Sequence, residues 1–95
     1  MNYHGHVYYR NKQKAQTARE QLKRRFQDKI HLFKLREGPI GPHPVPSFGL
    51  SFEQGLLLDI RSWMTENVNW MTGLLHPVIA NDVLAHTSYA EWIGG

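Results

Sequence analysis

The chain has 95 residues, a length that allows one small domain with a single core and excludes two. Its 41% hydrophobic content is typical of a soluble globular domain, which argues against disorder, and the net charge of +3 is only mildly basic. Cysteine is absent, so any metal would need nitrogen and oxygen ligands, and a reducing cytoplasm suits the chain. We expect neither an export signal nor a segment that spans a bilayer.

The first predicted element is a strand over Tyr3–Tyr9, where aromatic and β-branched residues are frequent. Alternation places His4, His6 and Tyr8 on one face and the remaining residues on the other. A helix is predicted from Asn11, a plausible cap, to about Asp28, because small and apolar residues recur at helical spacing while the charges fall elsewhere. These inward residues are Ala15, Ala18, Leu22 and Phe26.

The middle of the chain predicts two further strands and a second helix. A short strand over Ile30–Arg36 is followed by a proline-rich loop through residue 46, and a third strand covers Ser47–Phe52. Ser51 and Gln54 resemble a capping box that opens the second helix. Small residues on one face of the third strand leave room for a ligand, namely Ser47, Gly49 and Ser51. Inward residues of the second helix are Leu56, Leu57, Ile60, Trp63 and Met64.

A fourth strand over residues 73–76 completes a β-α-β-β-α-β order, and the tail beyond it has no clear period. This order predicts an α+β, ferredoxin-like βαββαβ sandwich as one domain over residues 1–95. Two helices would cover one face of an antiparallel-type sheet with the spatial order fourth, first, third, second. We expect the first and third strands to be parallel and the fourth to be antiparallel to the first. The face without helices would expose apolar surface, so we expect a homodimer.

Five of the six histidines fall into clusters near the start, middle and end of the chain. In the expected topology His4 and His6 begin the first strand, and His43 and His76 reach the same edge of the sheet. His86, beyond the fourth strand, could fold back over them. Singly, these motifs are weak, because an H-x-H is often two solvated imidazoles and a histidine before proline can serve a turn. Their convergence favours a metal or catalytic site over those structural roles. The sixth histidine, His31, is interpreted as an ordinary strand residue.

Basic residues between Lys12 and Lys29 raise the alternative of an RNA-binding domain of the same fold. They are better interpreted as the solvated face of the first helix, since Glu20 and Asp28 interrupt the charge. RNA-recognition domains of this fold carry exposed aromatics on the central strands, where this chain has histidines. We therefore expect no nucleic acid and no membrane as partner. The tryptophans are expected in the core or a dimer interface, with Trp70 and Trp92 as alternative walls of a pocket for a planar ligand.

Taken in order, four motifs resemble the DOPA 4,5-dioxygenase family of fungi and bacteria nearly from end to end: Tyr3-His4-Gly5-His6-Val7-Tyr8-Tyr9, Gly41-Pro42-His43-Pro44, Leu75-His76-Pro77, and Asn81-Asp82 with His86-Thr87. The resemblance implies a ferredoxin-like fold and an extradiol dioxygenase that cleaves the ring of DOPA or a related catechol with Fe(II) and O₂. It implies metal ligands among His4, His6, His43 and His76, with His86 as acid/base. Zinc or another divalent metal could occupy the site after purification.

One position departs from the family pattern. Members often carry a further histidine within H-T-D-H, whereas this chain has Tyr89 at that place. Tyr89 stays a catalytic candidate because a phenol can donate a proton, although it is a poor base near neutral pH. Asp82 is the obvious carboxylate near the cluster, which leaves open whether it joins the ligand set. A non-catalytic module of this fold that binds a metal or an aromatic ligand is the alternative function.

Overall fold

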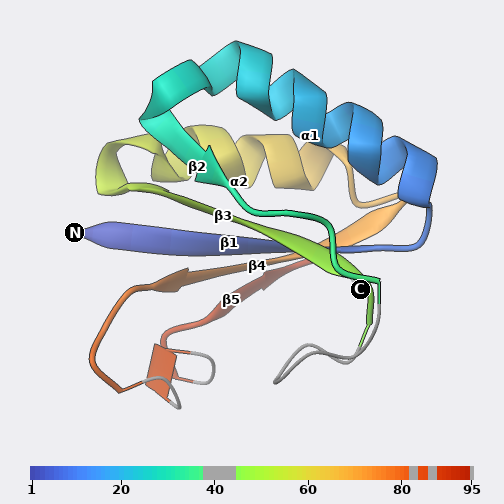
Figure 1. The fold of residues 1–95 in the computed structure, drawn as a ribbon. Coiled ribbons are helices and arrows are strands. Elements are labelled where there is room, and N and C mark those ends of the chain that lie inside the picture. The colour runs from blue at the N-terminus through green and yellow to red at the C-terminus, as the bar shows by residue number, and fades with distance from the viewer. Residues whose placement is uncertain (38–44, 82–83, 86–87, 95) are drawn as a thin grey trace.

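A computed structural model describes residues 1–37, 45–81, 84–85 and 88–94, and these residues form a sheet with both helices on one face (Figure 1). The five strands lie in the order β2-β3-β1-β4-β5 and all neighbouring pairs are antiparallel. The α+β class and the ferredoxin-like sandwich are therefore confirmed. The elements are β1 (Asn2–Tyr9), α1 (Lys12–Phe26), β2 (Ile30–Leu32), β3 (Ser47–Glu53), α2 (Leu57–Glu66), β4 (Met71–Pro77) and β5 (Glu91–Ile93).

The predicted direction of β3 is wrong, because β1 and β3 run antiparallel. The connection through α1 returns the chain so that β2 runs in the direction of β1, and β3 then pairs antiparallel with β2. As a result Ser51 lies opposite His4, while Ser47, at the start of β3, lies opposite Tyr8. The start of β3 therefore adjoins the end of β1, and the topological argument that brought His43 to the edge of His4 fails. His43 itself lies outside the described residues.

Helix α1 forms where the sequence pattern predicts it. The side chain of Asn11 accepts a hydrogen bond from the backbone N–H of Lys14 at 3.0 Å, which caps the helix start. All four predicted inward residues of α1 are buried. The helix ends at Phe26, and a 3₁₀ turn at Gln27–Lys29 leads into β2. The end is two residues earlier than expected because Gln27 adopts a positive φ of 51°, which an α-helix cannot continue.

Helix α2 does not begin with the predicted capping box. Ser51 belongs to β3, where it pairs with His4, and a 3₁₀ turn over Gln54–Leu56 precedes the helix. The start of α2 has no side-chain cap. The sheet therefore overrides the local capping signal, since the backbone of Ser51 is already committed to the ladder. The inward face is as predicted: three residues are buried and Leu56 and Leu57 pack partly against the core.

The edges of the sheet differ most from expectation. Strand β2 ends at Leu32, and the chain continues beside β3 with an isolated bridge between Arg36 and Ser47. From α1, the guanidinium of Arg19 donates hydrogen bonds to the carbonyls of Leu32 and Phe33 at 3.3 and 2.9 Å. Strand β4 begins earlier than predicted, at Met71. Strand β5 was not predicted, because three residues are too few for a periodic signal.

The core lies between the sheet and the two helices. Trp63 and Trp70 are buried there with ring centroids 6.4 Å apart, as predicted for these two, whereas Trp92 is 58% exposed. At Gly73 the backbone of β4 approaches α2 so closely that an added Cβ would lie 2.5 Å from the sulfur of Met64. In the part of the chain that the structure describes, neither helix is long and apolar enough to cross a membrane.

Candidate metal centre

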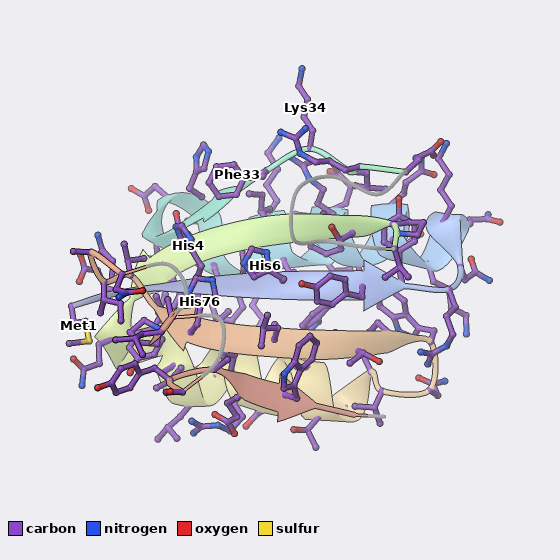
Figure 2. The ribbon with its side chains drawn as sticks, turned by 90° about the horizontal axis from the view of Figure 1, so that it is seen from below. Met1, His4, His6, Phe33, Lys34 and His76 are labelled. Atoms are coloured by element: carbon purple, nitrogen blue, oxygen red, sulfur yellow. The ribbon has the colours of Figure 1, made fainter. Side chains whose placement is uncertain are left out.

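The alternation of β1 sets the side on which its histidines lie. Val7 and Tyr9 are buried in the core against the helices, so His4 and His6 project from the opposite face of the sheet. Figure 2 views the molecule from this side and shows both imidazoles above the middle of the sheet. The sequence-based prediction that these two histidines share the helix-free face is thus confirmed.

Strand β4 supplies the third histidine. His76 lies directly opposite His4 in the antiparallel ladder, and it is 3% exposed. Its ring is 5.4 Å from that of His4 and 5.1 Å from that of His6, measured between centroids. Figure 2 shows the three side chains gathered on neighbouring strands. The expected convergence of these three is confirmed, although they are separated by up to 72 positions (76 − 4) in the sequence.

The nitrogen atoms of this cluster are close enough to share one ion. One ring nitrogen from each histidine lies within 4.8 Å of the others, and Nε2 of His6 is 2.9 Å from Nε2 of His76. Two imidazole ligands at right angles on a metal, with metal–nitrogen bonds of about 2.1 Å, would have their nitrogens about 3.0 Å apart. The donor set therefore fits a divalent metal such as iron or zinc.

The other ring nitrogen of His76 supports this orientation. Nδ1 of His76 lies 3.1 Å from the carbonyl oxygen of Pro77, to which an Nδ1–H can donate. In that tautomer Nε2 keeps its lone pair and can bind a metal or accept a hydrogen bond from His6. A histidine ligand whose second nitrogen donates to a carbonyl is a common arrangement in metal sites, because it fixes the ring and its tautomer.

A cavity of about 210 Å³ adjoins the histidines on the β3 side. Gly49, which lies opposite His6, has no side chain to fill this cavity. A Cβ added at Gly49 would lie 3.3 Å from the ring of Phe33 and 3.7 Å from Nδ1 of His6. The prediction that small residues of β3 face the histidines is confirmed. The cavity is lined by His4, His6, Phe33, Lys34, Arg36, Ser47, Gly49 and Leu50.

Two aromatic residues, Tyr8 on β1 and Trp92 on β5, lie near the histidines toward the end of β1. The ring of Tyr8 lies 6.3 Å from that of His6 and 5.7 Å from that of Trp92 on β5. Burial raises the pKa of the Tyr8 hydroxyl, so this phenol keeps its proton at neutral pH. Sequence reasoning placed Tyr8 on the face of the histidines but did not single it out. Phe33 and Arg36 were missed because regular alternation along the predicted strand Ile30–Arg36 places them on opposite faces, and a strand signal alone does not single out a site residue.

The remaining predicted site residues are not brought to this cluster by the described structure. His43, Asp82 and His86 lie outside the described residues. Tyr89 lies in a turn, where its backbone N–H donates to the carbonyl of Leu84, and its side chain is 59% exposed. His31 is exposed on β2 and contacts Phe33 edge-on, apart from the three clustered histidines, as its prediction as an ordinary strand residue implies.

Comparison with known proteins identifies the group to which this arrangement belongs. A model of the Dopa 4,5-dioxygenase family matches residues 3–95. The chain belongs to this family. The matched region contains all three clustered histidines, so the candidate metal centre lies within the part that defines the Dopa 4,5-dioxygenase family. The resemblance read from the ordered histidine motifs is confirmed.

Two curated relatives are similar over most of this chain. A DOPA 4,5-dioxygenase from Amanita muscaria is 27% identical over 101 residues, which cover 97% of this chain and 44% of that protein. An uncharacterized 21.2 kDa protein from Botryotinia fuckeliana is 29% identical over 102 residues, which cover 94% of this chain and 55% of that protein. The chain spans about half the length of these relatives.

A solved structure supports the fold. The crystal structure of a provisionally assigned dioxygenase from Nostoc punctiforme PCC 73102 superposes with a TM-score of 0.79 at 23% sequence identity. The match covers 99% of this chain and 82% of the other. At this identity the likeness establishes the shared fold alone.

Proposed function

We propose that this protein is an iron-dependent dioxygenase that cleaves the ring of DOPA or a related catechol beside a hydroxyl group. The observation that carries the proposal is the convergence of three imidazoles on the helix-free face, with Nε2 of His6 only 2.9 Å from Nε2 of His76. Family membership supports it, as does the similarity to the Amanita muscaria protein described as a DOPA 4,5-dioxygenase.

The histidines and the cavity beside them have complementary roles in this proposal. His4, His6 and His76 hold the metal as neutral ligands, and three ligands leave coordination positions open. A ferrous ion bound there would supply a Lewis acid for the catechol oxygens and electrons for dioxygen chemistry. The side chain of Phe33 then forms an apolar wall for a planar substrate. Gly49, which has no side chain, leaves space for that substrate next to His6.

We propose that His86 carries out proton transfer. This residue belongs to the family motif and lies outside the described part of the chain. An imidazole is suited to take a phenolic proton near neutral pH and to return it later. Tyr8, whose raised pKa keeps it protonated, is suited to donate a hydrogen bond but not to act as the base. Tyr89 is the weaker candidate, since its side chain is largely exposed.

The test is anaerobic loading with Fe(II), followed by air and a panel of catechols that includes DOPA and 4-ethylcatechol. We expect catechol-dependent oxygen uptake together with a new visible absorbance from the ring-opened product. His6→Ala and His76→Ala should abolish both. His31→Ala is the matched control, because His31 lies on the same sheet but outside the cluster, and it should keep full activity.

Three other outcomes would redirect the proposal. Stoichiometric iron binding without turnover of any catechol would favour the non-catalytic binding module. Failure to bind Fe(II) or Zn(II) at all would contradict the metal centre itself. A substitution at His86 that leaves turnover unchanged would remove this residue from the mechanism while leaving the metal centre intact.

A further inference from the structure

We infer that the catechol accepted by this site carries an anionic side chain, and that Arg36 binds its carboxylate. The inference rests on the proposed function and adds to it the substrate class and a specificity-determining residue. It is carried by the cavity beside His4 and His6, whose lining includes Arg36.

Arg36 reaches the histidine face because of a local irregularity in the sheet. Leu32 pairs with Leu50, and Arg36 pairs with Ser47. These two pairs are three positions apart in β3 but four positions apart in the opposing chain. This extra residue is a bulge, and it changes which side chain stands opposite Ser47. In a regular ladder Leu35 would occupy that place. With the bulge, Leu35 packs against the core and Arg36 takes the place.

The register then shows which face Arg36 shares. Ser47 lies opposite both Arg36 and Tyr8, and residues directly opposite in antiparallel strands project to the same side. Tyr8 and His6 are two positions apart on β1 and share a face. Arg36 therefore belongs to the helix-free face, two strands from β1, a separation on the order of 10 Å. A catechol ring with a short acid chain is of this size.

The backbone of Arg36 is held firmly although its side chain is exposed. Its N–H donates to the carbonyl of Ser47 at 2.7 Å, and its carbonyl accepts from the N–H of Ser47 at 2.8 Å. The hydroxyl of Tyr9 also donates to this carbonyl, at 3.5 Å. A guanidinium on a fixed backbone position can present its planar pair of donors to a carboxylate at low entropic cost.

The charges around the cavity favour an anion. Within the described part of the chain, no Asp or Glu lines the cavity and Arg36 forms no ion pair. Its sequence neighbour Glu37 is instead paired with Lys12. Lys34 adds a second positive charge to the lining. Among the described residues, a carboxylate in this cavity would thus meet positive and no negative charge, and an ammonium group would meet repulsion.

Arg36 is a better anchor than Lys34. Figure 2 shows the Lys34 side chain extending away from the three histidines, past the edge of the sheet. Arg36 can also bind a carboxylate with two parallel hydrogen bonds, which an ammonium cannot do. We therefore expect catechol acids to be preferred over neutral catechols, and neutral catechols over catechol amines. DOPA, which carries both charges, should fall below the corresponding acid without the ammonium.

The test compares three substrates that share a two-carbon side chain and differ in the group at its end: 3-(3,4-dihydroxyphenyl)propionate with a carboxylate, 4-ethylcatechol with none, and dopamine with an ammonium. With iron-loaded protein, Arg36→Gln should lower kcat/KM for the acid by about 10- to 100-fold, the usual effect of losing hydrogen bonds to a charged group. Turnover of 4-ethylcatechol should change less than about threefold, because it makes no such hydrogen bond. Arg24→Gln, which removes the same charge from the exposed surface of α1, is the control and should behave as wild type.

A second measurement does not depend on turnover. NMR titration of the purified chain without added iron would follow the backbone amide of Gly49 and the Nε–H of Arg36 as 3-phenylpropionate or 3-phenylpropan-1-ol is added. Neither compound has catechol hydroxyls. We expect shifts with the acid only, and their loss in Arg36→Gln.

The two measurements separate this inference from the proposed function. Binding of the acid through Arg36 without turnover of any catechol would support the inference and count against the dioxygenase. Turnover of 4-ethylcatechol with no preference for the acid, and no effect of Arg36→Gln, would overturn the inference and leave the dioxygenase standing. If Lys34→Gln lowers activity on the acid and Arg36→Gln does not, the assignment to Arg36 is wrong.

Discussion

Nε2 of His6 lies 2.9 Å from Nε2 of His76, a residue 70 positions away on the neighbouring strand. At this distance the two nitrogens can share one proton in a hydrogen bond, or both lone pairs can turn to a common metal ion. Two protonated nitrogens would repel each other. The same geometry therefore serves the metal-free and the metal-bound protein, and metal binding requires the shared proton to leave Nε2, either for Nδ1 of His6 or, when the pair carries an extra proton, for solvent.

This relationship predicts the effect of removing either histidine on metal affinity. His6→Ala and His76→Ala should each weaken Zn(II) or Fe(II) binding by at least about 100-fold, more than the loss of a residue that merely orients a ligand. Calorimetric titration would measure the dissociation constants. His31→Ala should bind as wild type. An unchanged affinity in folded His76→Ala, checked by circular dichroism, would show that the cluster is not the ligand set.

The close approach of β4 to α2 makes Gly73 sensitive to any side chain. Gly73→Ala should lower the free energy of unfolding by about 1 to 3 kcal/mol, because the new Cβ would displace Met64 from the core. Urea denaturation would measure the change. Gly55→Ala is the matched control, since an added Cβ at Gly55 meets nothing within 4 Å, and its stability should stay within about 1 kcal/mol of wild type. Equal stability of both variants would mean that Met64 moves aside freely.

The edge strand β5 is held to α2 by a forked ion pair. The guanidinium of Arg61 donates to both carboxylate oxygens of Glu91 at 2.8 to 3.1 Å, and both side chains are partly exposed. A double-mutant cycle with Arg61→Ala and Glu91→Ala should give a coupling energy of about 0.5 to 1 kcal/mol, near the upper end for exposed pairs. Hydrogen exchange at the amide of Trp92 should accelerate in both variants. Zero coupling would show that main-chain pairing alone holds β5.

Tyr8 should make stability depend on pH in the alkaline range. Burial raises its pKa in the folded protein above the ordinary value of 10.0, which the unfolded chain keeps. The folded state therefore binds the proton more tightly, and this contribution to stability is complete below pH 10 and is lost as the pH rises beyond it. Urea denaturation between about pH 8 and pH 11 should show a steeper loss in wild type than in Tyr8→Phe. Parallel curves would contradict this.

The homodimer and the cytoplasmic location stay predictions. Part of the helix-free face is covered by the chain itself, since Leu74 is 2% and His76 3% exposed on that side, so less apolar surface is bare than the sequence implied. Figure 1 shows described parts of the segment between β4 and β5 on this side of the sheet. Light scattering on the purified chain would decide the oligomeric state.

Local pattern was enough for several features of the site. The two-residue period of β1 determined that His4 and His6 face away from the core, because Val7 and Tyr9 must be buried. The helical period and Asn11 likewise determined α1 and its buried face. The order of elements was enough to bring His76 beside His4, since β4 returns along β1 in this topology. The first two features depend on the spacing of residues that are close in sequence, and the third depends on the order of the elements along the chain.

Pairing between distant segments decided the rest. The antiparallel direction of β3, the sheet role of Ser51 and the existence of β5 depend on which strand lies alongside, and local capping or periodicity does not contain this information. The bulge that turns Arg36 toward the histidine face is defined only relative to the residues of β3. The sequence by itself determined which imidazoles leave the core, because side-chain alternation is local. Only the tertiary structure decided what surrounds them, because strand register is set by long-range packing.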